Sequence, residues 1–269
     1  MPRCFRTASD GAIRLRPDWD AIFEKLTRID SRIVLQTRHA FARLIGRELP
    51  PRLFAAAVNG RDMLGESLMC EPRYWSTASA YIERCDCCDA PGRIEIRAAD
   101  GTEALQIHVP SSFSLDQWSE IITELAAPFK DEPAPRSHPG FFFALPDDAI
   151  RCGEPNQFPT LLRSCHDAAV CLGWQLCLPS VAHRREFIPA LRSYTQGVLT
   201  AGDGQFACQL ILPAATGLAL QRRDGVLGLH VIGPSDTVLL SIAATPDPES
   251  VERWHALLQQ HFPESPINP

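Results

Sequence analysis

The feature that most constrains this chain is a pattern that occurs twice, at residues 92–125 and again at 225–258. Each copy opens with a glycine, continues with two runs in which apolar and polar residues alternate, and closes with an amphipathic segment that contains a tryptophan. Alternation at period two is typical of a strand with one buried face. Each copy therefore predicts a β-hairpin followed by a helix, and the repetition predicts a tandem duplication.

The two predicted hairpins bury equivalent apolar faces. Asp100 and Gly101 form the turn of the first hairpin, because glycine accepts a positive φ without steric cost. In the second hairpin, Gly233 and Pro234 occupy the turn. The residues expected on the buried faces are Ile94, Ile96, Leu105, Ile107 and Val109 in the first copy, and Leu227, Leu229, Val231, Val238, Leu240 and Ile242 in the second.

The closing helices begin with recognisable signals. Ser114 and Gln117 have the spacing of a capping box, and Asp247 followed by proline is an equally good helix start. Trp118 and Trp254 each lie on an apolar stripe with helical spacing.

Two strands and a helix cannot bury their apolar face alone, so two such modules are expected to build related halves. The predicted fold class is α+β, a tandem structural duplication in which each half is an antiparallel β-sheet with flanking helices. A segment rich in proline and charge suggests a linker between the halves. The expected organisation is an N-terminal arm at 1–17, a first repeat half at 18–127, a linker at 128–140, a second repeat half at 141–262 and a tail at 263–269.

The remaining segments carry weaker signals. We expect a helix over 19–29, helical or mixed structure over 39–57, helices over 157–172 and 184–199, and strands over 32–37, 74–84, 205–212 and 216–222.

Composition narrows the class of protein. The chain has 269 residues, 45% of them apolar and 22% charged, with a net charge of −6. This acidic balance argues against a nucleic-acid partner, and no apolar run is long enough to span a membrane. The N-terminus does not resemble a secretory signal, so we predict a cytoplasmic protein whose ten cysteines are reduced thiols.

The common catalytic motifs are absent: the sequence contains no glycine-rich phosphate loop, no GxSxG elbow and no HExxH. Cys85, Cys87 and Cys88 form the densest cluster of chemistry-bearing residues, and Cys70 would supply a fourth thiol. Thiolates bind soft metal ions such as Zn²⁺ or Cu⁺. The alternative is an ordinary connection between strands, because structural zinc usually takes two spaced cysteine pairs and only one cluster is present.

The histidines give no catalytic pattern. Adjacent helical residues point about 100° apart, so Cys165 and His166 cannot act as a nucleophile–base pair with each other. We interpret them as a core cysteine and a surface histidine. His108 and His230 lie in the repeated strands, opposite the main apolar runs or at their edges, and are interpreted as hydrogen-bonded sheet histidines.

Five stretches resemble one known family. They are Ile33–Arg38, Arg73–Trp75, the hairpin 92–109, the run Leu218–Arg223 with the Asp-Gly that follows it, and Trp254 in the closing helix. These stretches are similar to segments of the haem-utilisation family that includes the HemS-like haemin-degrading and haem-transport proteins. The resemblance implies a tandem α+β duplication and haem binding for iron transport or degradation.

The resemblance also implies where the pocket differs. The family's axial haem ligand is a histidine in a segment that matches residues 154–162, and here Asn156 stands in its place. Two arginines of the family's pocket are matched by Ser76 and Ala169. An amide is a poor iron ligand compared with an imidazole.

Three hypotheses follow. In the first, haem or another planar tetrapyrrole binds in a cleft between the halves, with iron held by His166 or His183 or not held at all, and with arginines at the propionates. In the second, the fold persists as a non-enzymatic binding or regulatory module; in the third, the cysteine cluster forms a metal or redox site. A homodimer is also expected as a partner. The residues assigned to the tetrapyrrole are Arg38, Asn156, His166, His183, Arg222 and Arg223.

Overall fold

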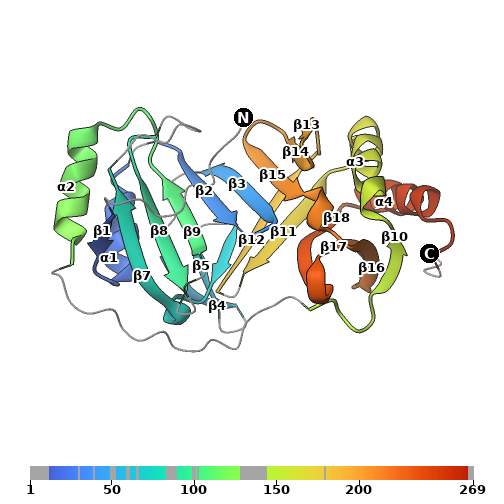
Figure 1. The fold of residues 1–269 in the computed structure, drawn as a ribbon, viewed down its shortest axis with the longest axis horizontal. Helices are drawn as coiled ribbons and strands as arrows, with labels where there is room; N and C mark the ends of the chain where they lie inside the picture. Colours follow the sequence, from blue (N-terminus) through green and yellow to red (C-terminus); the bar gives the residue numbers. More distant parts are fainter. Residues whose placement is uncertain are drawn as a thin grey trace. The chain divides into compact units, whose positions relative to one another are not determined.

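The structure is a computed structural model. It describes residues 12–29, 31–38, 40–48, 53–58, 61–64, 67–82, 90–98, 101, 103–127, 144–178 and 180–265. Within these residues the chain forms 18 β-strands and four α-helices, joined by short 3-10 turns. Figure 1 shows their course.

The first half of the sequence is rich in strands, with one helix near each end. Its elements are β1 (Ile13–Leu15), α1 (Trp19–Leu26), β2 (Ile33–Arg38), β3 (Ala42–Glu48), β4 (Leu53–Val58), β5 (Arg61–Leu64), β6 (Leu68–Cys70), η1 (Pro72–Tyr74), β7 (Trp75–Tyr81), β8 (Arg93–Ala98), β9 (Glu103–His108) and α2 (Leu115–Leu125).

The second half repeats this order. Its elements are β10 (Ile150–Gly153), η2 (Pro155–Gln157), α3 (Phe158–Asp167), β11 (Leu172–Leu178), β12 (Val181–Phe187), β13 (Leu191–Thr195), β14 (Val198–Gly202), β15 (Phe206–Ile211), η3 (Leu212–Ala214), β16 (Gly217–Arg223), β17 (Val226–Ile232), η4 (Pro234–Asp236), β18 (Val238–Ala244) and α4 (Pro248–His261). Each of β1–β9 thus has a counterpart nine strands later, and α1 and α2 correspond to α3 and α4. The predicted tandem duplication is confirmed.

The chain divides into two compact units, which are not simply its two halves. Unit 1 takes the described residues of Met1–Thr37, Gly46–Gly140 and Pro179–Val181, and unit 2 takes those of Arg38–Ile45, Phe141–Leu178 and Ala182–Pro269. Each half therefore contributes a short segment to the unit built mainly by the other half.

In unit 1, neighbouring strands are antiparallel and follow the order β1-β7-β8-β9-β2, while β4, β5 and β6 pair in sequence. The hairpin predicted at 92–109 is confirmed as β8 and β9. Its apolar face is buried, with Ile94 and Ile96 at 0% exposure, and the buried Trp118 on α2 shares this core. The predicted capping box forms, since Ser114 Oγ accepts from the Gln117 backbone N–H at 3.1 Å.

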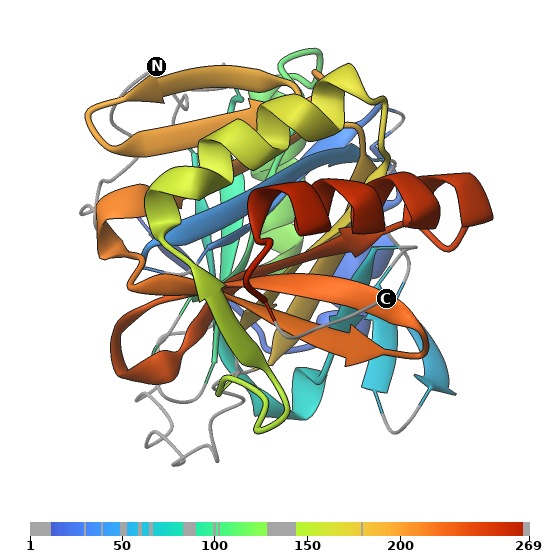
Figure 2. The same cartoon turned by 90° about the vertical axis from the view of Figure 1, so that its right-hand side faces the viewer.

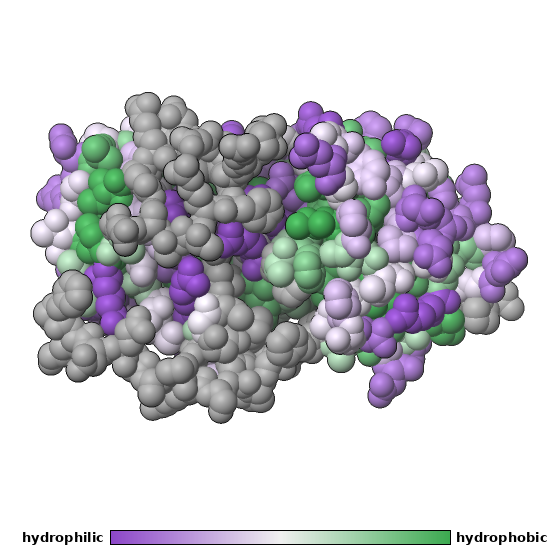
Figure 3. Space-filling view, in the orientation of Figure 1, coloured by the Kyte–Doolittle hydropathy of each residue, from purple (hydrophilic) through white to green (hydrophobic). Residues whose placement is uncertain are grey.

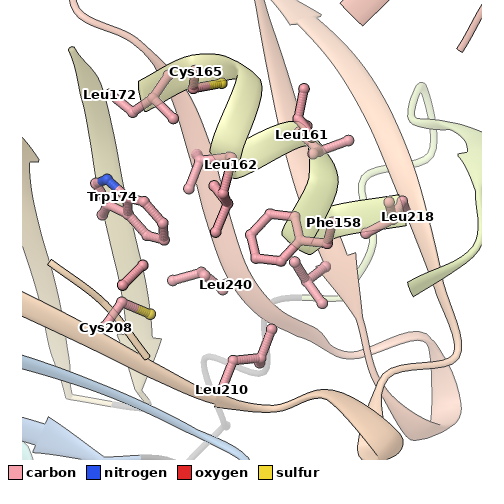
Figure 4. Packing of buried hydrophobic residues seen from close by; sticks show 14 of the residues in the cluster. Phe158, Leu161, Leu162, Cys165, Leu172, Trp174, Cys208, Leu210, Leu218 and Leu240 are labelled. Carbon is pink, nitrogen blue, oxygen red and sulfur yellow. The ribbon is translucent and has the colours of Figure 1, made fainter. Parts of the chain in front are cut away.

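In unit 2, the antiparallel order is β10-β16-β17-β18-β11-β12, and β13, β14 and β15 pair in sequence. The helices α3 and α4 lie next to each other, as the turned view in Figure 2 shows. Figure 4 shows the core that α3 closes, where Phe158 and Leu162 meet Trp174 of β11 and Leu240 of β18. On α4, the polar side faces solvent, and Figure 3 shows hydrophilic side chains over this helix.

The glycines that open the two repeated copies serve different purposes. A Cβ at Gly92 would lie 2.0 Å from the Trp118 Nε1, so the tryptophan can pack there only because the side chain is missing. Gly225 has φ +81 and open space around it, so it is required by the left-handed turn between β16 and β17. The glycine that opens each copy is therefore required for a different physical reason in each half.

Several local expectations are corrected. The segment 184–199 is not helical: it forms β12, β13 and part of β14, with Gln196 and Gly197 at positive φ in a tight turn. The segment 39–57 contains strands β3 and β4 where it is described, and Ile13–Leu15, expected within the arm, form β1. Across the described residues, no helix is both long enough and apolar enough to cross a membrane.

Candidate functional site

Asn156, the residue that stands where the resemblance puts an axial histidine, is exposed. It lies in η2, immediately before α3. This helix is anchored by buried Phe158, Leu161 and Leu162, whose spacing gives it one apolar face. The core therefore fixes the position of residue 156 while leaving its side chain accessible to a ligand.

His166 lies at the other end of the same helix and is also exposed. Ten helical residues span roughly 15 Å, so His166 and Asn156 do not share one site. Its neighbour Cys165 is fully buried, and burial raises the pKa of that thiol to about 12. The predicted division into a core cysteine and a surface histidine is confirmed.

His183 is in a different environment again. It lies on β12 with 0% exposure, and burial lowers the pKa of its imidazole to about 3. Alternation puts it on the same face of β12 as Phe187, whose ring stacks on Trp174 at 4.8 Å. The ring is thus neutral at physiological pH, and it is enclosed in the core instead of being presented to a ligand.

The arginines assigned to the propionates are also dispersed. Arg222 and Arg223 are exposed at the end of β16, where Arg223 Nε lies 3.9 Å from an Asp224 carboxylate oxygen. The other end of β16 pairs with Gly153, close in sequence to Asn156, and five strand residues span about 17 Å. Arg38 ends β2 and is half-buried.

The predicted ligand set therefore does not form one constellation. Nothing among the described residues groups three or more His, Cys, Asp or Glu side chains for a metal ion. The predicted thiol site at Cys85, Cys87 and Cys88 lies outside the described residues, so it stays a prediction. Of the residues predicted to hold a tetrapyrrole, His166 has the exposed imidazole and Asn156 the exposed amide.

The sequence analysis missed a buried polar network in unit 1. Glu95 on β8 is 3% exposed, and its carboxylate accepts four hydrogen bonds. The donors are Tyr81 Oη at 3.2 Å, Arg93 Nε at 3.3 Å, Arg97 at 3.2 Å and Gln106 Nε2 at 3.1 Å. Four donors from three different strands fix the orientation of this carboxylate.

The network extends across the sheet. Gln106 Oε1 accepts from Gln36 Nε2 at 2.7 Å and lies 3.3 Å from His108 Nε2. Burial, together with the nearby Glu95 carboxylate, raises the pKa of Tyr81, so this phenol remains a donor. The signal was present in the sequence as polar residues alternating with Ile94 and Ile96, but pairing with residues on other strands could not be inferred from it.

Comparison with known proteins gives a likeness in structure and none in sequence. No family model and no curated protein matches the chain. The crystal structure of apo-PhuS, a heme-binding protein from Pseudomonas aeruginosa, is similar at a TM-score of 0.74 and 12% identity, over 93% of this chain and 86% of that one. ChuS, an E. coli heme oxygenase, is similar at a TM-score of 0.76 and 12% identity, over 94% of this chain and 89% of that one.

These likenesses extend over nearly the whole chain, through both copies of the repeat. At 12% identity they establish architecture and not chemistry. The chain has a HemS-like α+β fold built from two duplicated antiparallel halves.

Proposed function

We propose that this chain binds haem or a closely related planar tetrapyrrole, as cargo for iron transport or as a substrate for degradation. The observation that carries the proposal is the likeness over 92–94% of the chain to PhuS, a heme-binding protein, and to ChuS, a heme oxygenase. The chain retains both halves of that architecture.

The proposal includes a specific departure from the usual coordination. Residue 156 is exposed at the start of α3, so a ligand can reach it, but its amide coordinates iron poorly. His166 is the accessible imidazole on the same helix, and His183 is enclosed. We infer that haem iron is held weakly or by His166, and that most of the binding free energy comes from contacts of the macrocycle and its carboxylates.

Titration of the purified full chain with haemin tests this. The wild-type protein should perturb the Soret band at stoichiometric haemin, either without an imidazole spectrum or with one that His166→Ala removes. Asn156→His should restore an axial imidazole, shift the Soret maximum and slow haemin dissociation. Arg163→His places an imidazole at another exposed position of α3 and serves as the matched control, which should behave like the wild type.

The outcomes separate the hypotheses. If the Asn156→His variant and the Arg163→His variant give the same spectrum, residue 156 does not face the tetrapyrrole. If neither the wild type nor the Asn156→His variant perturbs the Soret band, the haem proposal fails and the chain is better described as a non-enzymatic module on this fold. If His166→Ala abolishes the wild-type spectrum, the iron is held from the far end of α3.

A further inference from the structure

One face of the sheet in unit 2 carries a polar constellation that the tetrapyrrole proposal does not use. Strands β16, β17, β18 and β11 are consecutive neighbours, and each contributes one residue: Gln221, His230, Ser241 and Gln175. Their apolar neighbours, such as Leu229 and Ile242, point to the opposite face and belong to the core closed by α3 and α4. The polar face is therefore the one turned away from these helices.

The side chains form a directional chain of hydrogen bonds. Ser241 Oγ lies 2.8 Å from His230 Nδ1, and His230 Nε2 lies 3.2 Å from Gln221 Oε1. Gln221 Nε2 donates to Asp148 Oδ1 at 2.8 Å. His230 and Ser241 are directly paired across β17 and β18, so the sheet register itself sets the first contact.

The donor and acceptor roles in this series of hydrogen bonds follow from Asp148 at its end. A carboxylate only accepts, so the Gln221 amide nitrogen must face Asp148 and its oxygen must face the imidazole. His230 then carries its proton on Nε2, which leaves the Nδ1 lone pair to accept the Ser241 hydroxyl proton. Burial lowers the pKa of His230, and the nearby Asp148 opposes this, so the ring is mainly neutral at pH 7. A neutral imidazole aimed at a hydroxyl is the arrangement of a general base and its nucleophile.

Ser241 is half-buried, and the residues beside it have little side-chain bulk. The next row across the same strands consists of Gly228, Ala243 and Gly173, which have almost no side chains. A Cβ built on Gly228 would meet only strand carbonyls at 3.8 Å, whereas one built on Gly173 would meet the Arg184 guanidinium at 3.5 Å. The missing side chain at Gly228, directly opposite Gln221, also lets Gln221 reach diagonally to His230.

A donor for developing negative charge lies on the other side of the serine. Gln175 pairs directly with Ser241, and one of its amide hydrogens is donated to Cys177 Sγ at 3.2 Å. A carboxamide nitrogen carries a second N–H. Such a donor next to a nucleophile can stabilise an oxyanion.

We propose that Ser241 is a base-activated nucleophile toward small carboxylic esters, with His230 as general base and Gln221 and Asp148 as positioning residues. The Ser241 proton moves to His230 Nδ1 as Oγ bonds to the acyl carbon. The carbon–oxygen bond to the leaving group breaks, and the imidazolium protonates the departing oxygen. Water, deprotonated by the same imidazole, then bonds to the acyl carbon; the acyl–Oγ bond breaks, Oγ takes the imidazolium proton, and the carboxylic acid leaves.

Hydrolysis of p-nitrophenyl acetate by the full chain tests the proposal. The expected result is release of p-nitrophenolate together with an acetyl group on Ser241, located by peptide mass spectrometry. Ser241→Ala should lose the adduct, and His230→Gln, which keeps a hydrogen-bonding side chain but no base, should slow acylation about 100-fold or more. Gly228→Leu fills this row of small residues and should block acylation while the protein remains folded.

The chain provides a matched control and a test of the positioning role. Ser164 lies 3.0 Å from His261 Nε2, a second serine–histidine pair, but in the described structure no other hydrogen bond orients that ring. Ser164→Ala should leave acylation unchanged. Gln221→Leu should slow acylation and Gln221→Glu, which still accepts from His230 Nε2, should recover it. Absence of the acetyl adduct, an adduct on another residue, or full activity in Ser241→Ala or His230→Gln would overturn the proposal.

Discussion

Two rows of residues, each crossing four corresponding strands of one half of the duplication, are built in opposite ways. Across β7, β8, β9 and β2 the row is Ser79, Glu95, Gln106 and Gln36. Across β16, β17, β18 and β11 the row is Gln221, Gly228, Ala243 and Gly173. The first row is filled with hydrogen-bonded side chains, whereas three of the four positions in the second carry a methyl group or nothing.

The difference shows which part of the repeated module tolerates change. Both halves keep the strand order, the buried apolar face and the tryptophan helix, because each half needs them to form a core. The opposite face is not required for that core, so it carries a rigid polar network in one half and a row with few side chains beside His230 and Ser241 in the other. We interpret the first face as structural and the second as available for chemistry.

The largest expected effect is a contrast in stability between variants at Glu95 and at Gly228, one residue from each row. Glu95→Ala removes the acceptor of four donors and leaves Arg93 and Tyr81 buried without it, which should lower the free energy of unfolding by about 3–5 kcal/mol. Gly228→Ala adds a methyl group at ordinary contact distance and restricts the unfolded chain, so it should be neutral or stabilise by up to about 1 kcal/mol.

Urea unfolding of both variants, followed by circular dichroism, measures this contrast. Equal losses at the two positions would show that the two faces are alike in function, and would remove the distinction between a structural and an available face. Glu95→Gln, which keeps the shape and one acceptor oxygen, should lose less than the alanine variant.

A smaller loss of stability is expected at the tryptophan of the closing helix, a feature that both halves share. Trp118 donates from Nε1 to the Tyr81 carbonyl at 3.0 Å, and Trp254 donates to the Leu227 carbonyl at 2.6 Å. Both indoles are fully buried. Each Trp→Phe change removes this hydrogen bond and part of the ring volume, so each should cost about 2 kcal/mol. Thermal unfolding of the two variants should give similar shifts, and a negligible shift in one would mean that its half does not depend on the tryptophan.

The repeated module was predictable because its signals are local. Alternation at Ile94 and Ile96, the capping box at Ser114 and the stripe around Trp118 each depend on residues within one element. The helix predicted over 184–199 was wrong because the apolar spacing there also fits a helix. The feature that makes this segment a turn between strands is the positive φ of Gln196 and Gly197. Glutamine is an uncommon residue for that conformation, so this turn has only a weak signal in the sequence.

The sites were less predictable than the fold because they depend on register. Asp148 and Gln221 are far in sequence from Ser241, and the set meets only when β10, β16, β17 and β18 align. His230 was correctly expected on the polar side of its strand, but its partners could not be named. His183 was also not predictable: charged residues follow this histidine in the sequence, but its ring is enclosed by the core in the structure.

The smallest expected effect is on the pH dependence of the unfolding free energy, compared between the wild type, with buried His183, and a variant that has no titratable group at this position. Its folded-state pKa of about 3 lies below the ordinary value of 6.5, so below pH 6.5 the unfolded chain takes up a proton that the folded chain does not. The stability contributed by the neutral ring is therefore intact above pH 7 and is lost as the pH falls toward 3, by about 1 kcal/mol between pH 7 and 5.5. His183→Gln should show a flatter dependence of unfolding free energy over that interval, whatever its absolute stability. Parallel curves for the two proteins would show that His183 is protonated in the folded state, and that the core of unit 2 admits a charge where the structure places an enclosed imidazole.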